Sequence, residues 1–521
     1  MGNLGGSKFN YKYLRVDEIM NKKILLLYPN STNDGVMPLA IGILSTIAKD
    51  LGCEVEYFET SFYEKEGSVP EERERTGEFK VSDRKNAITL LPHHRLKKDF
   101  IEKLDSFRPD VLGVTANSIE FEKFEELIDG IDIRNSKPFT IVGGVHPTVA
   151  PEEVIKNPFI DALCRGEGEK AWEEILARLI NDQDISNIKN FWIKTKTGIE
   201  KNPIRPLIRE DKLWERPLDY SFFDERHFAA PFDGRIYHRG QIESSRGCPF
   251  QCTYCANTAF KNAYKGLGKF VRVRPFDNLV NAINKQVELG SEMIQFQDEC
   301  FLSVPYANLK EFCEWYGEEI KLPMMVQTRP ESVKEEKIKL LADMNTPVQI
   351  SCGIESGSER ILFEICMRKT KLQNIKKAFE IIKKYNIRAT GYTMIGFPTE
   401  TREEAFQTIF FIRDLDLDIS IMSIFYPFVG TPLRELCIEK GYITGKEKTI
   451  NFTDPPILKN QPMSPAEVYN IRRVYSLYTR LPQEYFPKIE LCEKDFDNNI
   501  DLYQDLISLM YKSYYRSWKL N

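Results

Sequence analysis

The first third of the chain alternates short, continuous apolar runs with longer segments whose apolar residues have helical spacing. The apolar runs span residues 23–28, 54–58, 110–115, 139–142 and 161–165. Such runs are typical of buried parallel strands, and the spacing over 38–51 predicts a helix. Gly166-Glu167-Gly168-Glu169 follows the last run and leads into a helix that ends near Leu179. This pattern predicts a doubly wound, Rossmann-like α/β sheet, whose ligands bind beyond the carboxyl ends of the strands.

A second alternation of strands and helices starts at residue 241. The predicted strands are 241–246, 293–297, 323–328, 348–353, 388–394 and 419–426. The predicted helices between them are 275–289, 305–319, 332–343, 371–385 and 401–413. Six βα units predict a partial (β/α)6 barrel of the TIM type, with its chemistry at the carboxyl ends of the strands.

The other segments lack a clear alternation. Residues 1–22 are a polar lead-in, and 62–95 are charged and without period, which predicts an insertion or surface loop. Residues 183–240 are rich in Pro and charge and predict a linker with a short edge strand at 191–194. Beyond 441, apolar and aromatic residues at helical spacing predict helices, the last from about 500 to 518, that pack on the barrel or cap its active site. The expected units are therefore 1–22, 23–182, 183–240, 241–440 and 441–521.

Composition narrows the class of protein. With 521 residues, 42% hydrophobic and 29% charged, the chain is long enough for several globular domains. The net charge is −5, so the chain lacks the excess of basic residues that typically binds nucleic acid. No apolar run approaches the roughly 20 residues of a membrane span, and Met1–Met20 lacks the apolar core of a signal peptide. The eleven cysteines are scattered apart from one trio, which indicates a reducing cytoplasm.

That trio is Cys248, Cys252 and Cys255, spaced CxxxCxxC directly after the predicted strand at 241–246. Three thiolates on one tight loop suit an iron–sulfur cluster or zinc. A closed structural site needs a fourth protein ligand, but the next cysteine is Cys300 and no His follows the loop closely. An open metal position is what a catalytic cluster requires. The alternatives are a zinc loop or three unrelated thiols.

The stretch 244–255, with the aromatic Tyr254 before the third cysteine, resembles the radical SAM superfamily. The resemblance implies that Cys248, Cys252 and Cys255 are the catalytic metal ligands of a 4Fe-4S cluster. The open iron of that cluster chelates the amino and carboxylate groups of S-adenosylmethionine (SAM). Reduction by a flavodoxin- or ferredoxin-type partner then yields a 5′-deoxyadenosyl radical, which abstracts hydrogen from an unactivated carbon.

Residues at the ends of the barrel strands fit SAM binding in the same family. Asp298 and Glu299 carry charges that can hold an ammonium group, although a solvated acidic turn would have the same sequence. Arg329 suits the SAM carboxylate, a substrate anion or a neighbouring acid. Glu355 lies in a segment that resembles the family's GxES motif, where the acid approaches the ribose. Gly396 permits close backbone approach where the family packs the adenine.

The first domain is similar to the cobalamin-binding domain that precedes many radical SAM domains, through "MPLAIGIL" after the first strand and "GGVHPT" after the fourth. The resemblance implies a cobalamin site at the strand ends. Its candidate residues are Thr115, Asn117, Ser118, Gly143, Gly144 and His146. The chain lacks the Asp-x-His-x-x-Gly motif that supplies cobalt with a His in other cobalamin domains, so the lower cobalt ligand is unassigned. His146 is a candidate, or a local hydrogen-bonding residue, and the domain could be a purely structural unit.

The function implied by the resemblance is a cobalamin-dependent radical SAM C-methyltransferase. The alternative is a cyclisation, ring contraction or oxidation without methyl transfer on the same scaffold. A methylthiotransferase is less expected because the first domain lacks its own cluster cysteines, and a non-catalytic SAM- or cobalamin-binding regulator is the remaining class. The expected substrate is a small molecule, a natural product or a lipid-type compound.

Overall fold

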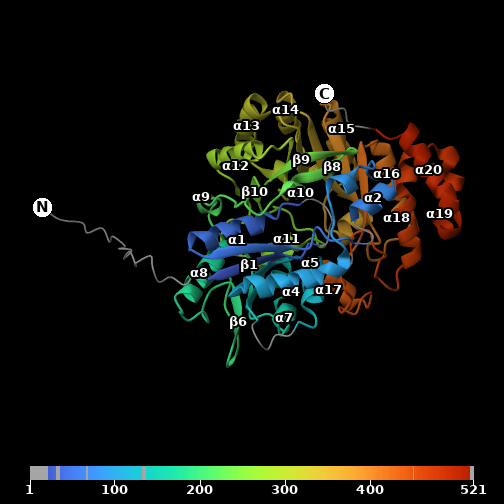
Figure 1. The fold of residues 1–521 in the computed structure, drawn as a ribbon. Coiled ribbons are helices and arrows are strands. Elements are labelled where there is room, and N and C mark those ends of the chain that lie inside the picture. Colours follow the sequence, from blue (N-terminus) through green and yellow to red (C-terminus); the bar gives the residue numbers. More distant parts are fainter. Residues whose placement is uncertain (1–21, 31–35, 66–68, 132–136, 450, 517–521) are drawn as a thin grey trace.

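The structure is a computed structural model that describes residues 22–30, 36–65, 69–131, 137–449 and 451–516. The predicted lead-in lies outside the described residues except for Lys22. Two seven-stranded sheets and a C-terminal group of helices make up the described chain (Figure 1).

The first sheet has the strand order β2-β1-β3-β4-β5-β6-β7. Its strands are β1 (Lys23–Tyr28), β2 (Glu54–Glu59), β3 (Val111–Thr115), β4 (Phe139–Gly143), β5 (Ala162–Cys164), β6 (Phe191–Thr195) and β7 (Gly198–Lys201). The first five strands are parallel, which confirms the sheet that the sequence predicts. The sequence predicts β6 as an edge strand, and this prediction is wrong, because β6 pairs with both β5 and β7. The exposed edge is β7, which the sequence did not suggest.

Helices cover both faces of this sheet. Ile24 and Leu26 of β1 pack in one cluster with α1 (Leu39–Asp50) and α8 (Glu169–Ile180). Leu25 and Leu27 point to the other face, toward α4 (Leu96–Phe107) and α5 (Ser118–Ile128). Because a strand's side chains alternate, a continuous apolar run buries both faces, and the sheet is doubly wound as expected.

The second sheet is a curled half-barrel with the order β16-β15-β14-β13-β12-β9-β8. Its strands are β8 (Ala229–Phe232), β9 (Arg235–Ile242), β12 (Met293–Phe296), β13 (Met324–Thr328), β14 (Val348–Glu355), β15 (Arg388–Ile395) and β16 (Ile419–Ile424). Its helices are α12 (Phe276–Glu288), α13 (Tyr306–Trp315), α14 (Glu335–Asp343), α15 (Leu372–Lys384) and α16 (Arg402–Leu415). The six parallel strands confirm the predicted βα units.

The first barrel strand starts earlier than the sequence predicts. β9 begins at Arg235 because it forms an antiparallel hairpin with β8 through Asp233-Gly234. Both turn residues have positive φ, 49° and 82°, as a two-residue hairpin turn requires.

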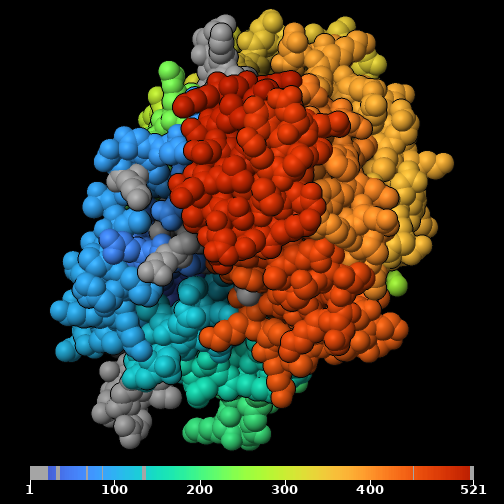
Figure 2. All heavy atoms as spheres, turned by 90° about the vertical axis from the view of Figure 1, so that its right-hand side faces the viewer, coloured from blue at the N-terminus to red at the C-terminus, as the bar shows by residue number. Residues whose placement is uncertain are grey.

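The segment predicted as an insertion or surface loop is instead built into the molecule. It contains α2 (Val69–Arg75) and α3 (Arg84–Ala87), and the C-terminal helices are α18 (Pro465–Arg480), α19 (Phe486–Lys494) and α20 (Ile500–Ser513). Its hydrogen bonds reach β16, α18 and α20. Figure 2 shows the C-terminal helices, in red, next to the blue N-terminal part of the chain. The fully buried Arg472 donates to Glu78 at 3.1 Å, and Glu78 accepts from Met422 N at 3.1 Å. Helix α20 ends at Ser513, earlier than the predicted 518.

Candidate active site

The entrance to the cysteine loop is held by Asp298, which follows β12. Asp298 accepts hydrogen bonds from Ser244 N at 3.1 Å, from Ser244 Oγ at 2.8 Å and from the hydroxyl of Ser245. The side chain is buried, and burial raises the pKa of Asp298 to about 7. Both oxygens of this predicted SAM-binding residue are therefore engaged in holding the loop.

The loop turns sharply at Gly247, where φ is 95°. A Cβ there would collide with the carbonyl oxygen of Phe270, so only glycine fits. Gly247 N donates to Glu299 Oε2 at 3.0 Å, and burial raises the pKa of Glu299. Glu299, unlike Asp298, lines the large cavity described below.

Cys248 is buried, whereas Cys252 and Cys255 are partly exposed. Thr258 Oγ1 donates to the carbonyl of Cys252 at 2.8 Å, and Lys261 Nζ donates to that of Pro249 at 2.8 Å, so the loop is fixed from both sides. Among the described residues, no group of three Cys, His, Asp or Glu side chains is placed so that it could bind a single metal ion. An iron–sulfur cluster does not need such convergence, because its thiolates bind different iron atoms. Three soft thiolates on one fixed loop therefore fit a cluster.

Arg329, at the end of β13, lies against this loop. Its Nη1 donates to Cys252 Sγ at 3.1 Å, and its guanidinium lies 3.8 Å from the centre of the Phe250 ring. Its Nη2 also donates to Glu331 Oε1 at 2.7 Å. The structure thus places the predicted carboxylate-binding arginine beside one of the three predicted cluster ligands.

A buried ion pair network lies beneath Arg329. Arg368 donates to Glu331 and Glu355 at 3.0 Å each and to the Gly353 carbonyl at 2.8 Å, with 1% of its side chain exposed. Burial raises the pKa of Glu355, while Arg368 and the hydroxyl of Tyr254 oppose that shift. Sequence reasoning found Glu355 and Tyr254 but missed Arg368 and Glu331, which belong to no motif and lie away from the predicted strand ends.

Gly396 ends β15 with φ 84°. Glu400 Oε2 accepts from Gly396 N at 2.6 Å and from Phe397 N at 3.2 Å, and burial raises the pKa of Glu400 to about 8. Sequence reasoning missed Glu400, although a Glu four residues after a strand-end glycine is the signal that could have found it.

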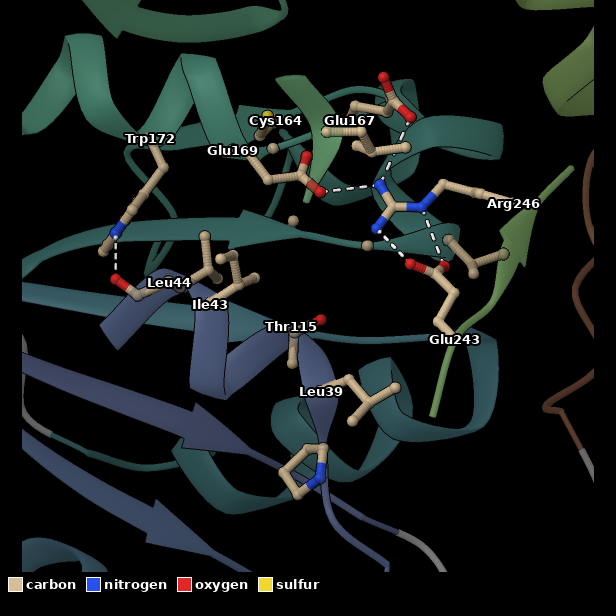
Figure 3. A pocket seen from close by; sticks show the side chains of 18 of the residues that line it. Leu39, Ile43, Leu44, Thr115, Cys164, Glu167, Glu169, Trp172, Glu243 and Arg246 are labelled. Atoms are coloured by element: carbon tan, nitrogen blue, oxygen red, sulfur yellow. Dashed lines mark hydrogen bonds and ion pairs between the residues drawn. The ribbon is translucent and has the colours of Figure 1, made fainter. Parts of the chain in front are cut away.

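A cavity of about 700 Å³ separates the two domains (Figure 3). Its barrel side includes Gly247, Cys255 and Glu299. Its first-domain side includes four predicted residues at the carboxyl ends of β3 and β4: Thr115, Asn117, Gly143 and Gly144. The structure therefore brings the cysteine loop and most of the predicted cobalamin residues to one space.

Ser118 and His146 do not line this cavity. His146 Nδ1 lies 3.1 Å from Ser118 Oγ, and the ring stacks on Phe121 with centroids 4.5 Å apart. Burial, followed by the charge of Arg434, lowers the pKa of His146 to about 4, so the ring is neutral at pH 7. His146 is thus a packed, hydrogen-bonded residue, and the cavity wall has no histidine among its described residues.

The first-domain wall suits a bulky ligand with apolar and amide groups. Leu39, Ile43, Leu44 and Trp172 supply an apolar surface, and a Cβ at Gly168 would meet no atom within 4 Å. Gly144 has φ 105°, and a Cβ there would lie 2.7 Å from Ala116 O, so the strand ends approach each other too closely for a side chain. These features fit a bulky cofactor such as cobalamin, which these wall residues would hold at the strand ends.

Curated relatives align with most of the chain. The Uncharacterized methyltransferase PH0819 of Pyrococcus horikoshii is 27% identical over 424 residues, which are 80% of this chain and 88% of the relative. Cytidylyl-2-hydroxyethylphosphonate methyltransferase of Streptomyces wedmorensis is 22% identical, covering 83% and 84%. Anaerobic magnesium-protoporphyrin IX monomethyl ester cyclase of Rubrivivax gelatinosus is 25% identical, covering 73% and 67%.

Solved structures share the fold. The radical S-adenosylmethionine methyltransferase TsrM from Kitasatospora setae, with cobalamin and a [4Fe-4S] cluster bound, has a TM-score of 0.60 at 18% identity and covers 80% of this chain and 76% of its own. The cobalamin-dependent radical enzyme OxsB, with aqua-cobalamin and S-adenosylmethionine bound, has a TM-score of 0.62 at 15% identity and covers 95% and 71%.

Two family models match the chain. The B12 binding domain matches residues 79–176, and the Radical SAM superfamily matches residues 242–412. The cofactors that go with these domains are a 4Fe-4S cluster, SAM and cobalamin. The chain therefore has the two domains of a cobalamin-dependent radical SAM enzyme, with a B12-binding domain ahead of its radical SAM domain.

Proposed function

We propose that the protein transfers a methyl group from cobalamin to a carbon atom of a small-molecule substrate. One observation carries the proposal: the cysteine loop and the strand ends of the first domain line the same cavity of about 700 Å³. A substrate in this cavity can contact both cofactor sites at once, so hydrogen removal and methyl delivery can act on one carbon.

The residues divide into two cofactor sites. Cys248, Cys252 and Cys255 would hold the cluster. Tyr254, Asp298, Glu299, Arg329, Glu355 and Gly396 would surround SAM, with Asp298 acting through the loop that it holds. Thr115, Asn117, Gly143 and Gly144 would hold cobalamin, with Ser118 and His146 packed behind them. When bound, the reduced cluster and SAM supply hydrogen abstraction, and methylcobalamin supplies the methyl group.

The chain's own residues position these groups and exclude water. Arg368 is shared between Glu331 and Glu355, which holds the Glu355 carboxylate in place as a buried acceptor for hydroxyl groups. Glu400 fixes the turn at Gly396, so a flat ligand can approach the backbone there. The Cys252 thiolate receives the Arg329 hydrogen bond, which lowers the free energy of the charged sulfur.

Relatives favour methyl transfer over the alternatives. Two of the three relatives described above are methyltransferases by name, and the third is a cyclase. Cyclisation without methyl transfer is therefore the second candidate. A small-molecule substrate agrees with a TsrM structure that has tryptophan as substrate.

The partner is a one-electron reductant of the flavodoxin or ferredoxin type, since SAM cleavage needs one electron. All eleven cysteines are unpaired, which supports a reducing, cytoplasmic location. Within the described residues, no helix has the length and apolar character to cross a bilayer. We propose no nucleic-acid partner, because the chain has no basic excess.

The test uses the reconstituted enzyme, a reductant, and SAM carrying a deuterated methyl group, incubated anaerobically with a small-molecule extract of a host culture. Methyl transfer predicts S-adenosylhomocysteine beside 5′-deoxyadenosine, and a product that carries the label. A product without label, formed with 5′-deoxyadenosine and without S-adenosylhomocysteine, replaces methyl transfer by cyclisation or oxidation.

A further inference from the structure

Five charged side chains form a polar wall of the cavity where the two domains meet. They are Glu167, Glu169, Glu243, Arg246 and Arg272, here called the Arg246 ion cluster. Glu167 and Glu169 come from the segment that joins β5 to α8 of the first domain. Glu243 and Arg246 lie at the start of the cysteine loop, as Figure 3 shows.

Arg246 contacts all three carboxylates. Its Nη1 lies 2.7 Å from Glu169 Oε1 and 3.4 Å from Glu167 Oε1. Its Nε and Nη2 donate to the two oxygens of Glu243 at 2.9 Å and 3.0 Å. Arg272 lies 2.7 Å from Glu167 Oε1. A planar guanidinium that makes bonds on three sides has its orientation fixed.

The cluster contacts the cysteine loop before and after its ligands. Arg246 precedes Cys248 by two residues and pairs with Arg272 in the short β10–β11 ladder (Ser245–Arg246 with Arg272–Val273). Beyond Cys255, helix α11 (Ala256–Ala263) leads to Tyr264, whose hydroxyl accepts from Glu167 N at 2.6 Å. Both ends of the loop are thus bonded to one segment of the first domain.

That segment is itself fixed. Glu167 Oε2 accepts from Ile208 N at 2.9 Å, and a Cβ at Gly166 would collide with the Tyr264 hydroxyl. Of Glu167 and Glu169, only 10% and 15% of each side chain is exposed. Ion pairs that only hold two domains together do not need contacts with the cysteine loop. Solvent-exposed ion pairs also contribute little to stability, whereas these two carboxylates are largely buried.

We propose that the Glu167 and Glu169 carboxylates act through Arg246 and Arg272 as positioning residues, which set the separation between the cysteine loop and the cobalamin-binding strand ends. Among the described residues, Glu169 Oε2 is buried without a hydrogen-bond partner, so the position of this carboxylate depends on its ion pair with Arg246. The inference rests on the proposed function in one respect: it requires the cluster and cobalamin to occupy these two sites.

The experiment measures the separation directly, without a substrate. The enzyme is reconstituted with its cluster and cobalamin, reduced until both are paramagnetic, and examined by pulsed electron paramagnetic resonance for the dipolar coupling between cob(II)alamin and the cluster. The Glu167→Gln/Glu169→Gln double variant is expected to show a weaker or broadened coupling at parental iron and cobalamin content. Glu174→Gln is the matched control, because Glu174 pairs with Arg178 on the same helix and does not line the cavity.

Parental coupling in the double variant, at parental cofactor content, overturns the inference. If the double variant loses cobalamin, Glu169→Gln and Arg246→Lys replace it, and parental coupling in both has the same meaning. Methyl transfer is tested separately, by whether the product carries the labelled methyl group. A failure of that test would not change the result of the resonance experiment.

Discussion

Arg329 Nη1 lies 3.1 Å from Cys252 Sγ, while the same guanidinium covers the ring of Phe250. A fixed positive charge and a hydrogen bond thus reach a sulfur that we assign to the cluster. Both interactions favour the reduced cluster, which carries one more negative charge. Arg329 therefore affects how easily the cluster accepts its electron.

Replacing this arginine by Arg329→Gln is expected to shift the midpoint potential of the cluster to more negative values, because the charge is lost. A redox titration followed by electron paramagnetic resonance measures the shift. Arg360→Gln is the control, since Arg360 pairs with Glu404 and contacts no cysteine. Equal potentials in the two variants would show that Arg329 does not act on the cluster.

Glu400 predicts a pH-dependent stability. Its pKa rises from 4.5 to about 8 in the folded state, so between these values the folded protein keeps a proton that the unfolded chain releases. This group therefore lowers the free energy of unfolding as pH rises through that window. Glu400→Gln lacks this dependence, so the variant should gain stability relative to the parent toward pH 8.

Thermal unfolding at several pH values measures this difference. In the control Glu404→Gln, the lost carboxyl has a pKa of about 2, below the window, so its effect should stay constant there. A difference for Glu400→Gln that is also constant with pH would contradict the assignment of a neutral carboxyl at this turn.

Gly144→Ala tests the strand ends that line the cavity. The new Cβ would lie 2.7 Å from a backbone oxygen at a φ of 105°. We expect a loss of about 1–3 kcal/mol in stability and a loss of bound cobalamin. Gly52→Ala is the control: its φ of 81° is also positive, but Gly52 does not line the cavity, so this variant should lose stability and keep cobalamin. Cobalamin retention after gel filtration, read from the visible spectrum, measures the outcome.

His146→Phe tests whether the strand-end histidine binds cobalt. The ring packs on Phe121 away from the cavity, so the variant should retain cobalamin and change stability by no more than about 1 kcal/mol. A variant that is folded but colourless after cobalamin reconstitution would make His146 a ligand after all.

Arg472→Leu tests how the segment around α2 is joined to the C-terminal helices. Removing Arg472 leaves Glu78 with the longer ion pair to Arg73 at 3.6 Å, so we expect a loss of about 3 kcal/mol, the low end for a broken buried pair. The double variant Arg472→Leu/Glu78→Leu should recover part of this loss. If unfolding by urea shows the single variant to be as stable as the parent, the pair is not a structural link.

The sequence was sufficient for features that depend on local patterns. The strands appear as apolar runs, the cysteine loop as a spacing, and Gly143 and Gly144 as a strand-end pair. Arg368 could not be predicted this way, because a buried charge is recognised only with its partner, and Glu331 is far from Arg368 along the chain. The direction of the His146 ring could not be predicted either, because it depends on α6 (Val145–Val149), which turns the ring toward Ser118. The segment 62–95 was predicted as a loop because several of its buried residues are polar or charged: Thr76, Glu78 and Arg84.

The central claim is that the cysteine loop holds a cluster that cleaves SAM. Anaerobic incubation of the reconstituted enzyme with SAM and a chemical reductant, followed by chromatography for 5′-deoxyadenosine, tests it most directly. The account predicts 5′-deoxyadenosine from the parent enzyme and none above background from Cys252→Ala. Equal amounts from both proteins, or none from an enzyme with full iron content, would contradict it.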